Sequence, residues 1–481
     1  MIIIKKTCKI LIKLLILWMI FVVLASTVAA GMHKPISSQE KEKNSLKNLY
    51  QVEEEIGPDR AEAIITPVDA LGVRLRMVQG AQQQLDIVYH TIREGGASYA
   101  FLWEVIQAAQ RGVQVRVIID SVANITSGKK VWKILEAMNR HPNIQVMEYS
   151  RFHLLKPWQW HMLLHDKFII ADNRLLLLGG RNIDQRHFAP YGFEKAITYD
   201  TDLFLWKHEE EKEGNSSGVT QVAAYMEELW HSGYCSPLKK ETNKKQVEKQ
   251  YQFLHQEEKK FQQENPLFYK QTLTDYLDRT VETSRVTLLS NPIENRKKNP
   301  LLWYQIQQVL AKAEKKVQIQ TPYSTGNKEL LHTLKETAKR IPVEIVTNSL
   351  RSTPNLVAYS NYFGHREKFL QTGAKLYEYQ SDNSNHGKSL VVDDRLVLIG
   401  SFNMDDRSMY LSTETMVAVD SIPLAEKMAK HIEDIKKESF LVGEDNQYVL
   451  HEGEEWVPPS MIKTISGKVV FWLMRLFQFL L

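Results

Sequence analysis

Short apolar runs alternate with longer amphipathic stretches through most of the 481-residue chain. In the first half, runs of strand length lie at 85–89, 113–120 and 144–148. The stretches between them, 99–111 and 131–139, space their apolar residues as a helix does. An order of strand, helix, strand, helix is typical of an α/β layer fold.

The same order returns in the second half of the chain. Apolar runs at 316–321, 343–347 and 375–378 predict strands, and 329–340 and 357–372 predict helices. A chain of this length also exceeds one ordinary hydrophobic core. The pattern therefore predicts two similar α/β domains.

These patterns divide the chain into segments. The segment that separates the two domains is rich in Lys, Glu and Gln, so we expect a solvated helical connector there. The predicted segments are a signal anchor or signal peptide at 1–31, a polar tether at 32–62, a first domain at 63–238, the connector at 239–284, a second domain at 285–449 and a tail at 450–481.

The N-terminus predicts a contact with a membrane. Lys5, Lys6, Lys9 and Lys13 precede an uncharged stretch at 14–30, which is typical of a signal anchor. Cleavage after small residues near the end of this stretch is the alternative. Lysines before a span stay in the cytoplasm, which would place the two domains on the extracytoplasmic side of a cell membrane, such as the bacterial inner membrane. Four further lysines between 34 and 47 oppose that orientation.

The C-terminus is apolar but too short and too charged to span a membrane. Aromatic and aliphatic residues fill 468–481, with basic residues at Lys463, Lys468 and Arg475. This composition predicts an amphipathic membrane-associating helix. A terminal helix packed on the domain body is the alternative.

Composition narrows the function classes. Hydrophobic and charged contents of 43% and 25% are those of a globular protein, and the net charge is only +4. Proteins that bind nucleic acids usually carry a strong basic excess, so the charge argues against a nucleic-acid partner. The chain has two cysteines, and Cys8 lies in the basic N-terminal segment, so we do not expect a disulfide framework.

One phrase occurs twice, with the spacing H-x-K-x4-D-x6-G-(G/S)-x-N. The first copy holds His165, Lys167, Asp172, Gly179 and Asn182. A chance match at this many fixed positions is rare enough that two copies indicate one origin. The second copy holds His386, Lys388, Asp393, Gly400 and Asn403. A repeat of a histidine and a lysine predicts a site built from two halves.

Each copy of the repeated motif predicts a strand whose histidine and lysine side chains point to the same face. Residues i and i+2 of a strand share a face, so each lysine lies beside its histidine. The apolar residues that follow predict a buried hairpin, which turns at Asp172-Asn173 in the first copy and at Asp393-Asp394 in the second. The asparagines would then lie near the same edge as the histidines.

These residue types suit a phosphodiester. Histidine attacks phosphorus or transfers a proton near neutral pH, while lysine and asparagine bind phosphate oxygens. Two copies of the three groups around one point would stabilise a trigonal-bipyramidal transition state. The sequence shows neither a cluster of carboxylates nor a set of cysteines and histidines with the spacing of a metal site. We therefore predict chemistry with no metal and no cofactor.

Each histidine also needs a carboxylate that orients it. Asp202 and Glu414 lie in predicted strands just past the two phrases, and we predict that they take this role. Asp172 and Asp393 belong to the repeated phrase and are counted with the catalytic set. Their place at the hairpin end leaves a structural role open.

The doubled phrase resembles that of the phospholipase D superfamily over roughly 64–449. The segments 179–183, 343–350 and 400–408 are similar, more narrowly, to bacterial cardiolipin synthases of the C type. The resemblance implies two α/β/α sandwich domains with the active site at their interface. Residues 184–188 depart from the usual acidic and aromatic run of those synthases, and Ser412-Thr413-Glu414 departs from the usual Asn-x-Glu.

The resemblance also implies roles. By analogy, His165 is the nucleophile that forms a phosphohistidine and His386 is the acid and base, with the reverse assignment open. Lys167, Lys388, Asn182 and Asn403 would bind the phosphate, and Asp202 and Glu414 match the family's histidine-orienting carboxylates.

The implied activity is a membrane-associated phosphatidyltransferase that passes a phosphatidyl group from a phospholipid to an alcohol or lipid acceptor, most simply to make cardiolipin. A phospholipase D that uses water is one alternative, and a phosphodiesterase acting on nucleic acid is another. A lipid-binding scaffold without activity fits poorly with two intact pairs of histidine and lysine.

Overall fold

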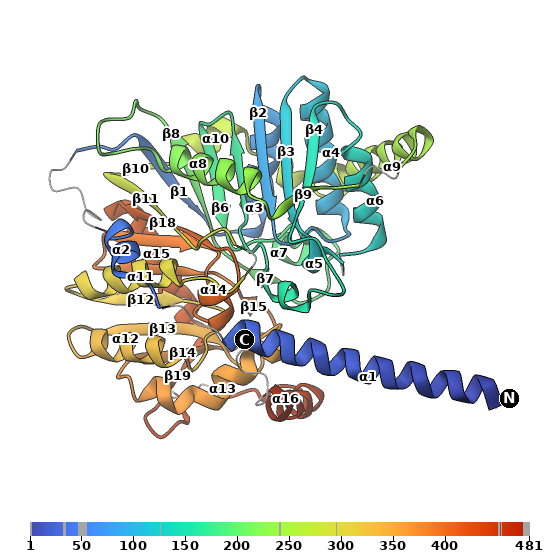
Figure 1. Ribbon diagram of the computed structural model, residues 1–481. Helices are drawn as coiled ribbons and strands as arrows, with labels where there is room; N and C mark the ends of the chain where they lie inside the picture. Colours follow the sequence, from blue (N-terminus) through green and yellow to red (C-terminus); the bar gives the residue numbers. More distant parts are fainter. Residues whose placement is uncertain are drawn as a thin grey trace.

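The computed structural model describes residues 2–31, 35–46, 55–125, 127–239, 242–294, 296–450, 453 and 455–474. Parts of the predicted tether, at 32–34 and 47–54, lie outside the described residues, as do Arg475 and the rest of the tail. Within the described part, most strands belong to two large sheets, one in each half of the chain (Figure 1).

The first sheet has nine strands among the described residues. Its order is β10 (Val281–Glu282), β1 (Asp59–Ile64), β8 (Asp202–Lys207), β6 (Leu175–Gly179), β5 (Phe168–Ala171), β2 (Gln84–Tyr89), β3 (Gln114–Asp120), β4 (Ile144–Tyr149), β9 (Cys235–Pro237).

The second sheet repeats this order with equivalent strands. It runs β11 (Arg285–Ser290), β18 (Thr415–Asp420), β17 (Leu396–Gly400), β16 (Ser389–Val392), β12 (Val317–Gln320), β13 (Val343–Asn348), β14 (Lys375–Tyr379), β19 (Ser439–Val442), β20 (Tyr448–Val449). In both sheets three central strands are parallel, and the hairpin that follows the repeated histidine is antiparallel to them. The predicted fold class, two similar α/β domains, is confirmed.

Helices cover the sheets in layers. The outer layer of the first half contains α3 (Pro67–Gly80), α4 (Gly96–Gln110) and α6 (Lys129–Met138), whose apolar residues share one core with that sheet. The outer layer of the second half contains α11 (Leu301–Lys312), α12 (Lys328–Ala338) and α13 (Leu356–Leu370).

A third core lies between the halves. The helices α8 (Gly218–His231) and α15 (Ile422–Lys437) supply it together with both sheets. Residues as far apart in sequence as Leu164, Val219 and Val417 are buried in this one cluster. The two halves are therefore joined by a continuous apolar interface, which holds their facing edges in a fixed relation.

The segment predicted as a solvated connector is instead part of the first half. Its main helix, α9 (Lys244–Glu264), packs on α4 and α6 and buries Leu254 and Phe261. After α9, the chain returns to the first sheet as β10, which pairs with β1. The charged residues that suggested a free helix occupy the outer face of a packed one.

The described part of the tether also packs. Its helix α2 (Ser38–Lys43) precedes Leu46, which is buried, and the main-chain oxygen of Leu46 accepts a hydrogen bond from Lys312 Nζ at 2.6 Å. Short elements complete the fold: α5 (Ser121–Asn124), α7 (Gln185–Phe188), α10 (Leu273–Asp278), α14 (Asp406–Tyr410), η1 (Pro157–His161), η2 (Pro266–Tyr269).

Two terminal helices expose apolar surface. The first, α1 (Ile2–Gly31), extends away from the body in Figure 1, and its residues Lys9–Val28 are long and apolar enough to cross a membrane. This helix fits the predicted anchor. The second, α16 (Met461–Met474), packs on α13, with the rings of Phe363 and Phe471 6.0 Å apart. Its other side exposes Ile462 and Trp472.

Candidate active site

The two repeated phrases lie at the interface between the halves. His165 and Lys167 directly precede β5, and His386 and Lys388 directly precede β16, the equivalent strand. Each lysine is buried and donates a hydrogen bond from Nζ to the main-chain oxygen of its own histidine. The two copies therefore share this lysine contact, and Lys388 Nζ additionally lies 2.8 Å from Nδ1 of His386.

Main-chain pairing joins each phrase to the opposite half. The strand β15 (Ser384–Asn385), which leads into His386, pairs in parallel with β7 (Thr198–Tyr199) of the first half. The His386 amide then donates to the oxygen of Tyr199 at 2.7 Å. On the other side, Leu164 forms a parallel bridge with Thr413. The His165 amide donates to the oxygen of Thr413 at 3.2 Å.

This pairing places a carboxylate of one half behind each histidine of the other. Asp200 follows Tyr199, and its Oδ2 lies 2.6 Å from His386 Nδ1. Glu414 follows Thr413, and its Oε1 lies 2.9 Å from His165 Nδ1. A carboxylate at Nδ1 fixes the tautomer that leaves Nε2 free for reaction. Neither histidine has its orienting carboxylate in its own domain.

The prediction that Asp202 orients a histidine is wrong. Asp202 is the first residue of β8, and its Oδ2 accepts hydrogen bonds from Arg74 and Arg181, each at 2.9 Å. The period-two pattern of a strand gave no way to choose between Asp200 and Asp202. The choice is made by the place where β7 pairs with β15, one residue before Asp200.

Asp172 and Asp393 are predicted with the catalytic set, but their carboxylates bind main-chain amides at the hairpins, which is the structural role that the sequence left open. Both occupy hairpin turns with positive φ, 52° and 56°. The Asp172 carboxylate accepts hydrogen bonds from the amides of residues 82–84, at 2.7–2.9 Å. The Asp393 carboxylate accepts from those of residues 314–316, at 2.6–3.1 Å. Each aspartate therefore fastens its hairpin to the start of the neighbouring parallel strand.

The two asparagines follow the hairpins. Asn182 comes after β6 and accepts a hydrogen bond at Oδ1 from the Thr91 amide at 3.2 Å. Asn403 comes after β17, and its main-chain N–H donates a hydrogen bond to Ser408 Oγ at 3.1 Å. The Oδ1 atom of Asn403 is buried with no hydrogen-bond partner in the described structure.

Burial sets the charge states in the site. Burial and the neighbouring lysines lower the pKa of both His165 and His386 well below the usual value of 6.5. Burial lowers the pKa of Lys167 to about 8 and that of Lys388 to about 7. Burial also raises the pKa of Glu414 to about 7. Histidines that are neutral at pH 7 have a free nitrogen lone pair, as a nucleophile requires.

Several groups around the site were missed by the sequence analysis. Glu414 accepts hydrogen bonds from Ser401 and Ser408 as well as from His165. Asp120, at the end of β3, accepts from the Leu164 amide at 2.7 Å and so fixes the residue before His165. A carboxylate at the end of a parallel strand is a signal for the active edge of such a sheet, and it could have identified Asp120.

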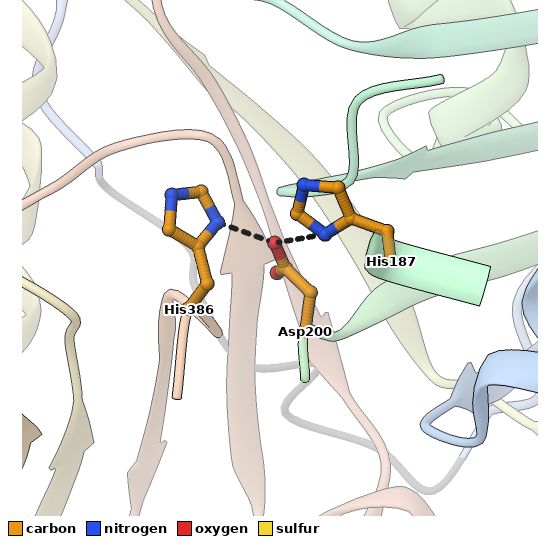
Figure 2. Close-up of side chains that lie close together, drawn as sticks. All are labelled: His187, Asp200 and His386. Atoms are coloured by element: carbon orange, nitrogen blue, oxygen red, sulfur yellow. Dashed lines mark hydrogen bonds and ion pairs between the residues drawn. The ribbon is translucent and has the colours of Figure 1, made fainter. Parts of the chain in front are cut away.

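One cluster has the residue types of a metal site. His187, Asp200 and His386 place one potential ligand atom each within 4.8 Å of one another (Figure 2). His187 lies beside one of the two histidine–carboxylate pairs, with the ring centroids of His187 and His386 5.6 Å apart.

Comparison with known proteins agrees with this architecture. The profile of a family described as "Cardiolipin synthase, PLD-like domain" matches residues 75–230 and 306–436, which together are more than half of the chain. The chain is 25% identical over 401 residues to cardiolipin synthase C of Escherichia coli K12, covering 76% of this chain and 82% of that protein.

Two further similarities cover most of the chain. An uncharacterized protein of Helicobacter pylori is 26% identical over 432 residues, covering 82% of this chain and 83% of that one. The crystal structure of phosphatidylserine synthase from Haemophilus influenzae Rd KW20 superposes with a TM-score of 0.62 at 16% identity, over 92% of this chain and all of that one. The structural match concerns the fold.

Proposed function

Since the chain belongs to the family of cardiolipin synthase, PLD-like domains within the phospholipase D superfamily, as its doubled phrase predicts, we propose that it is a phosphatidyltransferase. The reaction would cleave the phosphodiester of a phospholipid and pass the phosphatidyl group to an alcohol. The observation that carries the proposal is the pair of partly buried histidines, each hydrogen-bonded to a carboxylate from the opposite half.

In the first step, Nε2 of His165 attacks phosphorus, and a phosphorus–nitrogen bond forms as the bond to the leaving alcohol breaks. The negative charge of the bound phosphodiester favours the protonated form of His386, which takes a proton from solvent as the substrate binds and then gives it to the leaving oxygen. Asp200 stabilises the imidazolium before this transfer. The product is a phosphatidyl group held on His165.

In the second step, His386 accepts the proton of an acceptor hydroxyl, whose oxygen attacks phosphorus and releases His165. Lys167 and Lys388 would offset the charge on the phosphate oxygens in both steps, with the side-chain amides of Asn182 and Asn403 as further donors. The two halves are alike, so the roles of the histidines could be exchanged. Only 15% of the His165 side chain and 12% of the His386 side chain are exposed, and this limited access of solvent favours a lipid alcohol over bulk water as acceptor.

A membrane location supports lipid as the substrate. The apolar helix α1 is long enough to anchor the protein, with Lys9 and Lys13 near its start. A groove of about 1720 Å³ lies beside this helix, and its lining includes Leu24, Val28 and charged residues of both signs. In this proposal the apolar residues contact an acyl chain, and Lys297 attracts the phosphate. We propose that the catalytic domains lie on the extracytoplasmic side, since the lysines precede the span.

The test is an assay of purified protein with phosphatidylglycerol vesicles, with and without glycerol or phosphatidylethanolamine, read by mass spectrometry of the lipids. Formation of cardiolipin is the expected result. Phosphatidic acid as the sole product would instead identify a hydrolase. Cleavage of single-stranded DNA without any lipid turnover would refute the proposal.

A further inference from the structure

A second histidine lies against the Asp200–His386 pair. His187 of α7 is 1% exposed, and its Nδ1 lies 3.8 Å from Oδ2 of Asp200. Figure 2 shows the imidazoles of His187 and His386 on opposite sides of this oxygen. The Nδ1 atom of His187 is buried and makes no hydrogen bond within the described residues. A buried nitrogen of this kind is costly unless it binds something.

The three groups approach the geometry of a zinc site. Zinc binds imidazole nitrogen and carboxylate oxygen at about 2.0–2.2 Å in a tetrahedron, so its ligand atoms lie roughly 3.3 Å apart. The two distances to Asp200 Oδ2, 2.6 Å from His386 and 3.8 Å from His187, lie on either side of that value. The three ligand atoms lie within 4.8 Å of one another, so shifts of up to about 1.5 Å would bring them to a tetrahedral spacing and leave a fourth position for water.

The equivalent place in the other half is not built this way. His90 lies beside His165, with the ring centroids 5.0 Å apart, but His90 Nδ1 is hydrogen-bonded to the oxygen of Leu164 at 2.8 Å. Ser401 and Ser408 donate to the carboxylate of Glu414. Among the described residues, the Nδ1 atom of His187 beside the Asp200–His386 pair therefore has no hydrogen-bond partner, whereas the Nδ1 atom of His90 beside the Glu414–His165 pair has one.

We propose that His187, Asp200 and His386 bind a divalent cation of the zinc class and that the bound ion inhibits the enzyme. The ion would take the Nδ1 lone pair of His386 and the oxygen of Asp200, so it would replace the hydrogen bond that orients the imidazole. Lys388 Nζ lies 2.8 Å from His386 Nδ1 and opposes a cation there. We therefore expect micromolar affinity, as for a reversible regulator. The inhibitory part rests on the proposed function.

Binding is measured first, because it needs no substrate. Protein without a histidine tag is titrated with zinc chloride by calorimetry, and with cobalt(II) by visible absorption for the bands of a tetrahedral site. One saturable ion per chain is expected. His187→Phe and His187→Gln should each weaken zinc binding by about tenfold or more, whereas His187→Cys, which keeps a ligand atom, should retain it. Thermal melting identifies which variants are folded.

The binding result decides the site. Absence of a saturable ion in the wild-type protein would overturn the proposal. So would a folded His187→Phe or His187→Gln variant that binds zinc as tightly as the wild type.

Inhibition is measured by lipid turnover. Zinc should reduce the rate of the wild-type protein by half near its measured dissociation constant, and EDTA should restore the rate. His187→Phe should turn over lipid at close to the wild-type rate and resist zinc. Bound zinc without loss of turnover would overturn the inhibitory role. Absence of turnover without zinc would refute the proposed function instead, and the calorimetry would then decide the metal site by itself.

Discussion

The Nδ1 atom of His386 lies 2.6 Å from Oδ2 of Asp200, a carboxylate that belongs to the other half of the chain. The same exchange joins His165 to Glu414. Each half therefore holds a histidine that it cannot orient by itself. The proposed catalytic unit is therefore the interface, and its geometry depends on the short parallel pairing of β7 with β15 and on the bridge between Leu164 and Thr413.

The exchanged carboxylates predict that Asp200→Asn will lower kcat by about 10³–10⁴-fold while the protein remains folded, because the amide stabilises the wrong histidine tautomer. Asp202→Asn is the matched control two residues away. It should instead destabilise the protein by about 3–5 kcal/mol, since Arg74 and Arg181 would lose their buried counter-charge. Steady-state kinetics and chemical denaturation separate the two effects. A folded Asp202→Asn variant with the larger loss of kcat would contradict this assignment.

A covalent intermediate is expected on His165. A phosphatidyl ester of p-nitrophenol needs no acid for its first step, so His386→Ala should accumulate an adduct that only slowly passes to an acceptor. Mass spectrometry after alkaline quenching should locate the adduct on His165, and His165→Ala should form none. An adduct on His386 in the His165→Ala protein would reverse the two roles.

The lysines predict the pH dependence. The pKa of Lys388 is about 7 and that of Lys167 about 8, and the ammonium form exists below these values. The rate constant kcat/KM, which reports groups of the free enzyme, should therefore fall as the pH rises through this range. A flat profile between pH 6 and 9 would show that the lysine charges are not needed.

The free energy of unfolding should rise with pH, whereas kcat/KM falls. The pKa of Lys388 in the folded protein is lowered from 10.5, so between pH 7 and 10.5 the unfolded chain binds more protons and the contribution of Lys388 to stability rises with pH. Lys388→Met should abolish turnover but raise the melting temperature at pH 7 by roughly 2–4 °C, equivalent to about 1 kcal/mol. This difference should shrink as the pH approaches 10. A lower melting temperature for the variant at pH 7 would contradict the destabilising charge.

The hairpin aspartates should matter for stability and not for chemistry. Removing the charge and the acceptors in Asp172→Ala or Asp393→Ala should each cost about 2–4 kcal/mol, because the main-chain amides that each carboxylate binds lose a charged partner. Urea denaturation measures the loss, and kcat of the folded fraction should stay within about threefold of wild type. A large fall in kcat at unchanged stability would return these residues to the catalytic set.

The exposed side of α16 predicts its role at a membrane. Replacing Ile462 and Trp472 by serine should weaken binding to anionic vesicles in a flotation assay, since both side chains are largely exposed. Phe471→Ser is the control, because that ring packs on Phe363 and its loss should loosen the helix from the body. Unchanged vesicle binding by the double variant would assign α16 to packing alone.

Local periodicity accounts for what the sequence determined by itself. Alternating strands and helices fixed the α/β class, and the repeated spacing located His165, His386 and their lysines, because these depend on neighbours a few residues apart. The same spacing also included Asp172 and Asp393, although they serve the hairpin. A shared motif identifies residues that are needed without separating catalysis from folding.

Only the tertiary structure decided which groups meet. The choice of Asp200 over Asp202 depends on the pairing of Tyr199 with Asn385, 186 residues away along the chain, and no local period encodes that register. The packing of α9 on α4 and the position of His187 beside Asp200 are likewise contacts that no local pattern encodes. Contacts between distant segments follow from how whole faces bury their apolar area, and this sets the geometry of the site.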